Sequence, residues 1–189
     1  MKKLTKTLSV LSLVAAFGFS TTDVIAQDKK EEKKVEKQVR KTDKVVSDIM
    51  GANMYEVGLL ELAIQKGKSE DLKNTAAQLL PMHKQMGQEI REFATKNGYT
   101  VEAEEAKKYQ SKIKKWESHN TGLELDHDIA EELVDLHKDG LDMLKSGKED
   151  TKDEGLRAWI DKQMPVMRDH LATLEPLKDK TKKPWTEKN

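Results

Sequence analysis

The chain has 189 residues, which allows one ordinary domain, and it contains no cysteine, so disulfides, thiolate zinc sites, iron–sulfur clusters and a cysteine nucleophile are excluded. Its 34 basic and 34 acidic side chains cancel to a formal net charge of zero, which is not the basic footprint of a nucleic-acid-binding protein. Only 5% of the residues are aromatic, whereas Lys, Glu, Leu, Ala and Met are abundant, and this composition favours helices over a β-sandwich or barrel.

Residues 1–26 have the pattern of a secretory signal peptide. Three lysines precede an apolar stretch over 8–19, and Val24 and Ala26 form a V-x-A site that predicts cleavage before Gln27. The apolar stretch is too short to span a bilayer, which needs about 20 apolar residues. The missing cysteine also excludes a lipid anchor just after the signal. We therefore expect an exported protein, periplasmic or peripheral to the outer membrane, with no integral membrane span once the signal is removed.

The rest of the chain is expected to hold one folded domain between two solvated ends. Residues 27–41 form a charged leader of Lys, Glu and Gln in which only Val35 and Val39 are apolar. A helical bundle domain is expected over 42–178. Residues 179–189 are expected to form a flexible tail.

Four long segments place apolar residues at alternating steps of three and four, the spacing that builds one face of a helix. These segments span about 42–66, 69–97, 121–146 and 151–177. Gly67, Gly98 and Gly147 follow the first three segments and are expected to end them, and Ser69 is a good N-cap for the second. The sequence therefore predicts an all-α fold built on four long amphipathic helices.

A shorter helical pattern lies between the second and third long segments, over about 102–117. At 1.5 Å per residue it reaches about 24 Å, far enough to run back along the bundle. Such a crossover leaves long helices 2 and 3 parallel, as in a ferritin-like four-helix bundle with a helical crossover between helices 2 and 3. The alternative is a simple up-down-up-down bundle, because only the first and last helix pairs have loops short enough to force antiparallel neighbours.

Each of the four stripes contains at least one ionisable residue at a step that faces the core, where an unpaired charge is costly to bury. These residues are Glu56, His83, Asp126, His137 and His170. Counted from the bundle end where the first helix closes, Glu56 and His83 lie at similar depths and are able to meet. His137 and His170 differ in depth by roughly 12 Å, and Asp126 lies nearest the end. The count therefore does not predict one compact site that contains all five.

These five residues are the candidate metal ligands. Di-iron bundles use Glu-x-x-His pairs, but Leu80, Val134 and Met167 stand three residues before the histidines, so a ferroxidase or di-iron oxygenase is disfavoured. Imidazole and thioether together suit Cu(I), with Met82, Met86 and Met167 as possible soft co-ligands. Methionine is also an ordinary filler of helical cores. A transition metal is therefore a candidate cofactor without being a required one.

The signatures of common enzyme classes are missing from the sequence: it has no nucleophile elbow, no glycine-rich phosphate loop and no HExxH. Three hypotheses remain. The favoured one is a non-catalytic envelope bundle that binds a ligand or has a structural role. The second is a periplasmic protein that binds copper or another transition metal through core His, Glu and Met. The third is a hydrolase or oxidase without a recognisable motif. A metal ion or another envelope protein is the expected partner, and the oligomeric state stays open.

Four stretches carry a resemblance to a known family. They are MYEVGLLELAIQKG around Glu56, LLPMHKQM around His83, Asp126 placed eleven residues before His137, and MPVMRDHLATLEPL around His170. Over about 47–177 the chain resembles the ferritin-like, signal-bearing bacterial domains grouped as domain of unknown function 4142 and often labelled as outer membrane proteins. The resemblance implies a helical bundle in the cell envelope and implies no activity.

Overall fold

The computed structural model describes residues 21–101, 103–118 and 122–181. Residues 1–35 and 36–189 form two compact units, and the bundle belongs to the second. Most of the expected signal peptide and residues 182–189 of the expected tail lie outside the described residues. The leader residues 27–41 are helical, and most of their described side chains are exposed.

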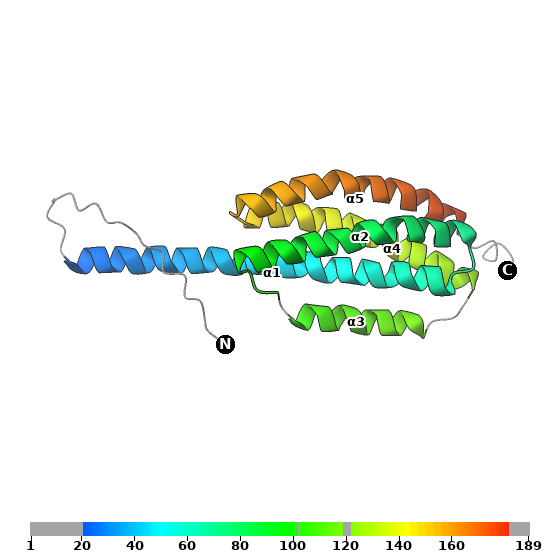
Figure 1. Ribbon diagram of the computed structural model, residues 1–189, viewed down its shortest axis with the longest axis horizontal. Coiled ribbons are helices and arrows are strands. Elements are labelled where there is room, and N and C mark those ends of the chain that lie inside the picture. The colour runs from blue at the N-terminus through cyan, green and yellow to red at the C-terminus, as the bar shows by residue number, and fades with distance from the viewer. Residues whose placement is uncertain (1–20, 102, 119–121, 182–189) are drawn as a thin grey trace, which may run out of the picture. The chain divides into compact units, whose positions relative to one another are not determined.

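The described residues form helices and no strand, which confirms the all-α prediction (Figure 1). The helices are α1 (Thr21–Lys66), α2 (Glu70–Asn97), α3 (Ala103–Glu117), α4 (Leu123–Asp150) and α5 (Glu154–Lys180). None of these helices is long and apolar enough to cross a membrane.

The ends of α2 follow the expected capping chemistry. The Ser69 hydroxyl accepts the Leu72 backbone N–H at 3.3 Å, and Glu70 and Asp71 lie in the first turn, where the helix dipole favours acids. Gly98 ends the helix in the left-handed conformation with φ 71°, which glycine adopts without strain. Both predicted boundaries of the second long helix are confirmed.

The predicted end of the third long helix at Gly147 is wrong, because α4 continues to Asp150. A Cβ added at Gly147 would lie 2.8 Å from Val45 Cγ1 of α1. Glycine therefore permits close packing of α4 on α1 at this position. The last helix begins at Glu154 because Asp153 is its N-cap and accepts the Leu156 backbone N–H at 2.9 Å.

The connections give a ferritin-like four-helix bundle with a helical crossover. The start of α4 lies at the α1–α2 turn, where Asp126 accepts the backbone N–H groups of Lys68 and Ser69. At the other end Thr42 of α1 and Thr151 before α5 are joined by a 2.9 Å hydrogen bond between their hydroxyls. Helix α3 runs back along the bundle, so α2 and α4 point the same way (Figure 1). The up-down-up-down alternative is excluded.

The apolar core consists of two clusters separated along the bundle axis. One lies toward the α1–α2 turn and includes Leu59, Leu72, Leu79, Ile129, Leu133 and Leu174. The other lies toward the α4–α5 turn and includes Ile49, Ile90, Leu144, Leu156, Ile160 and Met167. Every long helix contributes residues to both clusters and carries at least one buried polar side chain near the boundary between them. This division of the core positions the candidate site.

Several apolar residues at core-facing positions of the predicted helical pattern, among them Leu123, Phe93, Trp159 and Val166, are not fully buried. Leu123 is 57% exposed because it is the first residue of α4. On α5 the inward position falls on Met167, which is 4% exposed, while its neighbour Val166 is only half-buried.

Candidate metal centre

A layer of four polar side chains lies between the two apolar clusters, with one side chain from each long helix. Glu56 comes from α1, His83 from α2, His137 from α4 and His170 from α5, and each is at most 3% exposed. Four ionisable groups so thoroughly removed from water must be satisfied by one another or by a bound ion, because an unpaired buried charge is very costly.

The three histidine rings touch one another. Their centroids are 5.0 Å apart for His83 and His170, 5.2 Å for His83 and His137, and 5.6 Å for His137 and His170. One ring nitrogen from each histidine lies within 4.8 Å of the others. The depth difference of about 12 Å expected between His137 and His170 is therefore wrong.

The depths of His137 and His170 along the bundle differ from the prediction because α4 and α5 begin and end at other residues than expected. Asp126 of α4 lies level with the α1–α2 turn, so α4 starts beyond that turn. His137 follows Asp126 by eleven residues and Glu56 precedes Gly67 by eleven residues, so the two lie at equal depth. In addition, α5 continues to Lys180, three residues past the predicted end at Leu177, which places His170 deeper from that end.

Acceptors surround the Nδ1 atoms of two histidines. His83 Nδ1 lies 3.0 Å from Glu56 Oε2 and 3.2 Å from Asn53 Oδ1. His137 Nδ1 lies 2.8 Å from the Leu133 carbonyl oxygen and 3.5 Å from Glu56 Oε1. Because every one of these neighbours accepts hydrogen bonds, we assign a proton to Nδ1 of both rings.

This assignment also determines which nitrogen of the third ring, His170, carries the proton. In its neutral form His83 then has a lone pair on Nε2, and His170 Nδ1, which lies 3.2 Å away, donates its N–H to that atom. All three Nε2 atoms therefore carry lone pairs. His137 Nε2 and His170 Nε2 are fully buried and have no hydrogen-bond partner among the described residues. Each such unsatisfied buried atom lowers the free energy of unfolding by about 1–3 kcal/mol.

The electrostatics of the layer favour neutral imidazoles at His137 and His170 next to one carboxylate. Burial lowers the pKa of His137, and burial with repulsion from His83 and His137 lowers the pKa of His170 to about 4. Burial acts to raise the pKa of Glu56, but attraction to His83 and His137 outweighs it and the net shift is downward. At neutral pH the layer therefore presents the Glu56 carboxylate and imidazole lone pairs on His137 and His170, the protonation state that metal binding requires of these groups.

Asp126 does not join this layer. It is fully buried at the end of the bundle, where its two oxygens lie 2.9 and 3.0 Å from Lys68 N and one lies 2.6 Å from Ser69 N. It stands eleven residues from His137 on the same helix, or about 16 Å along the axis. The structure therefore places Asp126 as a cap of the α1–α2 turn, apart from the histidines.

The three candidate thioethers occupy different surroundings. Met82 is 40% exposed and lies outside the core. Met86 and Met167 are buried in the apolar cluster nearer the α4–α5 turn. Met167 packs against Gly140, where an added Cβ would lie 2.9 Å from its Cε. These contacts describe apolar packing, and the polar layer itself consists of imidazole and carboxylate groups.

Sequence reasoning missed Asn53. Its amide donates to the His83 carbonyl oxygen at 3.0 Å while its Oδ1 faces His83 Nδ1, so one side chain holds both the backbone and the ring of His83. Gly87 leaves room for it, because an added Cβ would lie 2.6 Å from Asn53 Nδ2. The available signal was the spacing, since Asn53 precedes Glu56 by one helical turn and Gly87 follows His83 by one.

The metal-free protein is expected to lose stability as the pH falls from about 6.5 to about 4. In the unfolded chain His170 binds a proton near 6.5, whereas its folded pKa is about 4. The unfolded state therefore binds more protons in this window, and stability that is present above pH 6.5 decreases on acidification. We expect His170 to account for about 2 kcal/mol of this loss. Urea unfolding with EDTA at pH 7.5 and 4.5 should show a smaller loss in His170→Leu, and equal losses would contradict the assignment.

Comparison with known proteins identifies one family. The family model described as "Domain of unknown function (DUF4142)" matches residues 26–177, a range that contains all the residues of the polar layer. No curated protein and no solved structure matches the chain.

Proposed function

The chain belongs to the DUF4142 family, whose description assigns no activity, and from its site we propose that it is a non-catalytic cell-envelope protein that binds one transition-metal ion. The proposed ligands are the Nε2 atoms of His83, His137 and His170. The observation that carries the proposal is the pair of buried Nε2 lone pairs, on His137 and His170, for which the described part of the chain offers no hydrogen-bond partner.

The surroundings of the rings suit metal binding. A ligating histidine usually donates its other N–H to a carboxylate or a backbone carbonyl, which fixes the tautomer and raises the basicity of the ligand. Here His83 faces the Glu56 carboxylate, and His137 donates to the Leu133 carbonyl oxygen. Glu56 is thus the proposed partner of the ligands, and it supplies one negative charge to offset the charge of the ion.

The size of the cluster is close to what one ion needs. Ligand nitrogens about 2.0–2.1 Å from a tetrahedral ion lie about 3.4 Å apart. One nitrogen of each ring lies within 4.8 Å of one nitrogen of the other two, so side-chain rotations that also release the hydrogen bond between His170 and His83 would close the site. Three imidazoles without a thiolate suit Zn²⁺ and copper better than the hard ions Mg²⁺ and Ca²⁺.

Burial supports a non-catalytic role. The three rings and Glu56 are enclosed by the four long helices, and none is more than 3% exposed. A substrate that reacted at the ion would have to pass between packed helices. Export to the envelope is the second part of the proposal, supported by the lysine-rich start, the apolar stretch and the V-x-A site of residues 1–26.

Metal analysis tests the proposal. Protein purified from a periplasmic extract without chelators, and the same protein titrated with Zn²⁺, Cu(I), Fe²⁺ or Co²⁺, is expected to take up one equivalent of at least one ion. At a free-ion concentration 100 times the dissociation constant, binding should stabilise the fold by about 2.7 kcal/mol. If no ion is taken up stoichiometrically, the metal proposal fails and the layer has only a packing role. Recovery of the protein in the cytoplasmic fraction alone would contradict the proposed location.

A further inference from the structure

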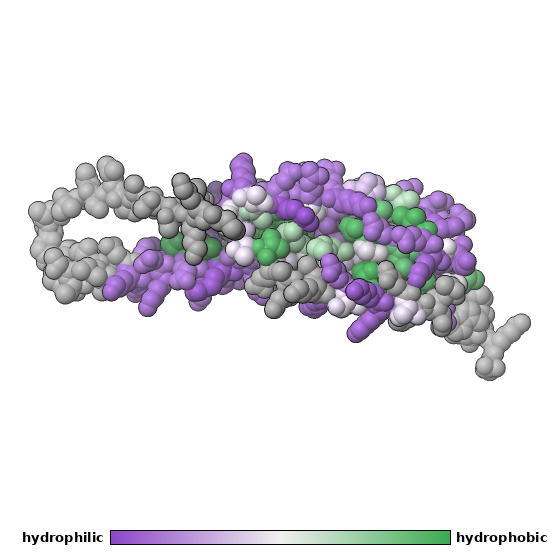
Figure 2. All heavy atoms as spheres, turned by 60° about the horizontal axis from the view of Figure 1, so that its bottom comes forward, coloured by the Kyte–Doolittle hydropathy of each residue, from purple (hydrophilic) through white to green (hydrophobic). Residues whose placement is uncertain are grey.

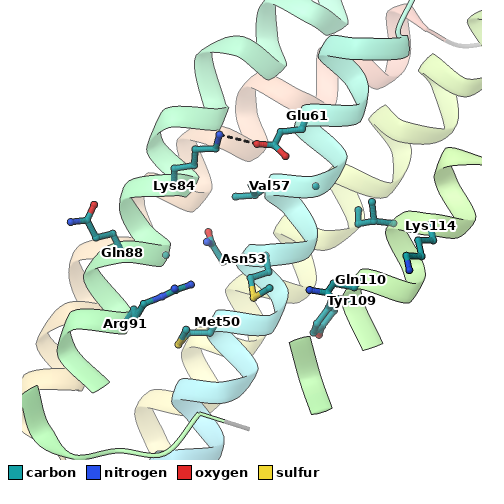
Figure 3. A pocket seen from close by; sticks show the side chains of 14 residues that line it. Met50, Asn53, Val57, Glu61, Lys84, Gln88, Arg91, Tyr109, Gln110 and Lys114 are labelled. Atoms are coloured by element: carbon teal, nitrogen blue, oxygen red, sulfur yellow. Dashed lines mark ion pairs between the residues drawn. The ribbon is translucent and has the colours of Figure 1, made fainter. Parts of the chain in front are cut away.

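A second candidate site lies on the opposite side of Asn53 from the histidines. A cavity of about 620 Å³ opens between α1, α2 and α3, within the range of 300–1,000 Å³ typical of small-molecule sites. Figure 3 shows the side chains that line it, with α1 between the other two helices. Its apolar lining consists mainly of Met50, Met54, Val57, Tyr109 and Ile113.

Helix α3 packs on α1 beside the cavity. At Gly58 an added Cβ would lie 2.6 Å from Ile113 Cδ1, so the two helices approach closely there. One turn away, Trp116 Nε1 donates to the Tyr55 hydroxyl at 2.7 Å. Figure 2 brings this side of the bundle forward and shows hydrophobic residues in the middle of the face, with hydrophilic ones along its borders.

The charge at the rim is positive. Lys84 and Glu61 neutralise each other in an ion pair of 2.8 Å. Arg91 on α2 and Lys114 on α3 also line the cavity, and neither side chain makes an ion pair with any described residue. In Figure 3 the Arg91 side chain extends from α2 toward Met50. An anion bound beside Arg91 would therefore meet a cation that has no ion-pair partner among the described residues.

We propose that this cavity binds an amphipathic monoanion, specifically a fatty acid. Its alkyl chain would lie on the methionines and Val57, and its carboxylate would pair with Arg91. Methionine suits such a floor because its flexible thioether adapts to chains of different length. Arginine suits the head group because its planar guanidinium binds a carboxylate with two parallel hydrogen bonds.

Binding of decanoate to the purified protein tests this proposal, measured by isothermal titration calorimetry in EDTA below the micelle-forming concentration. One saturable site is expected. Arg91→Gln should weaken binding at least about tenfold, the effect of losing one charge-assisted hydrogen bond. Decanol, which lacks the charge, should bind at least about tenfold more weakly than decanoate. Arg168→Gln, at an exposed arginine of α5, should leave binding unchanged.

A blocking variant locates the alkyl chain. Val57→Phe should fill the floor of the cavity and reduce decanoate affinity at least about tenfold, with circular dichroism showing that the variant is folded. Absence of saturable decanoate binding, equal affinity for decanol, or an Arg91→Gln variant that binds like the original protein would each overturn the proposal. Because the titration contains EDTA, its outcome is independent of the metal proposal.

Discussion

Replacing His170 by leucine is expected to abolish stoichiometric metal uptake while leaving the metal-free fold about as stable as before. The variant removes one of three proposed ligands, so the affinity should fall at least about 100-fold, more than the loss typical of a partner that only orients a ligand. The gain in stability that excess metal gives the original protein should disappear with it.

The metal-free fold should tolerate the change for a reason specific to this layer. His170 Nε2 is already unsatisfied, and the leucine removes it. His83 Nε2 loses the donor at 3.2 Å and becomes unsatisfied instead, so the number of unsatisfied buried atoms is unchanged. The new methyl groups would meet the apolar neighbours Met167 and Leu174. We therefore expect the free energy of unfolding in EDTA to change by less than about 1.5 kcal/mol.

His127→Leu is the matched control, because His127 lies away from the layer and is only half-buried. It should bind metal like the original protein. A His170→Leu protein that is strongly destabilised in EDTA would show that the layer is built for packing alone. A folded His170→Leu protein that still binds one equivalent at full affinity would contradict the assigned ligands.

The second large effect, a loss of stability, is expected when Asp126 is replaced by alanine. Truncation to alanine removes a buried carboxylate that accepts the backbone N–H groups of Lys68 and Ser69, and so leaves both without that acceptor. Hydrogen bonds to a charged group contribute about 1.5–3 kcal/mol each, and part of that is recovered where water reaches the exposed Lys68. We expect the free energy of unfolding to fall by about 3 kcal/mol in urea titration.

The same variant separates a cap from a ligand. Asp139→Ala, at an exposed aspartate of the same helix, should change stability by less than about 0.5 kcal/mol. The Asp126→Ala protein, measured at a temperature where it is still folded, should take up metal with the stoichiometry of the original protein. Loss of metal uptake by the folded variant would show that Asp126 belongs to the site after all.

The helices were predictable because their signals are local. Apolar spacing, the Ser69 cap and the Gly98 stop each depend on a few neighbouring residues, and each was confirmed. The polar residues of the layer were also visible, because Glu56 and the three histidines interrupt otherwise apolar stripes. The crossover followed from the length of the segment that became α3.

The register between helices was not predictable from the same signals. It depends on how far α4 starts beyond the α1–α2 turn, and that is set by tertiary contacts such as Asp126 with Lys68 and Gly147 with Val45. An error of two helical turns in the relative position of two helices is about 11 Å, which is enough to place His137 and His170 at different depths in the prediction. Asn53 was missed for a related reason, since its role depends on the position of His83 across the helix interface.

X-ray absorption at the metal edge of the zinc-loaded protein tests the central claim most directly. Our account predicts a first shell that contains three imidazole nitrogens at about 2.0–2.1 Å, with the outer-ring scattering typical of histidine. It also predicts that this imidazole signal is lost in His170→Leu under the same loading conditions. A shell of oxygen atoms without imidazole scattering, or identical spectra for the two proteins, would contradict it.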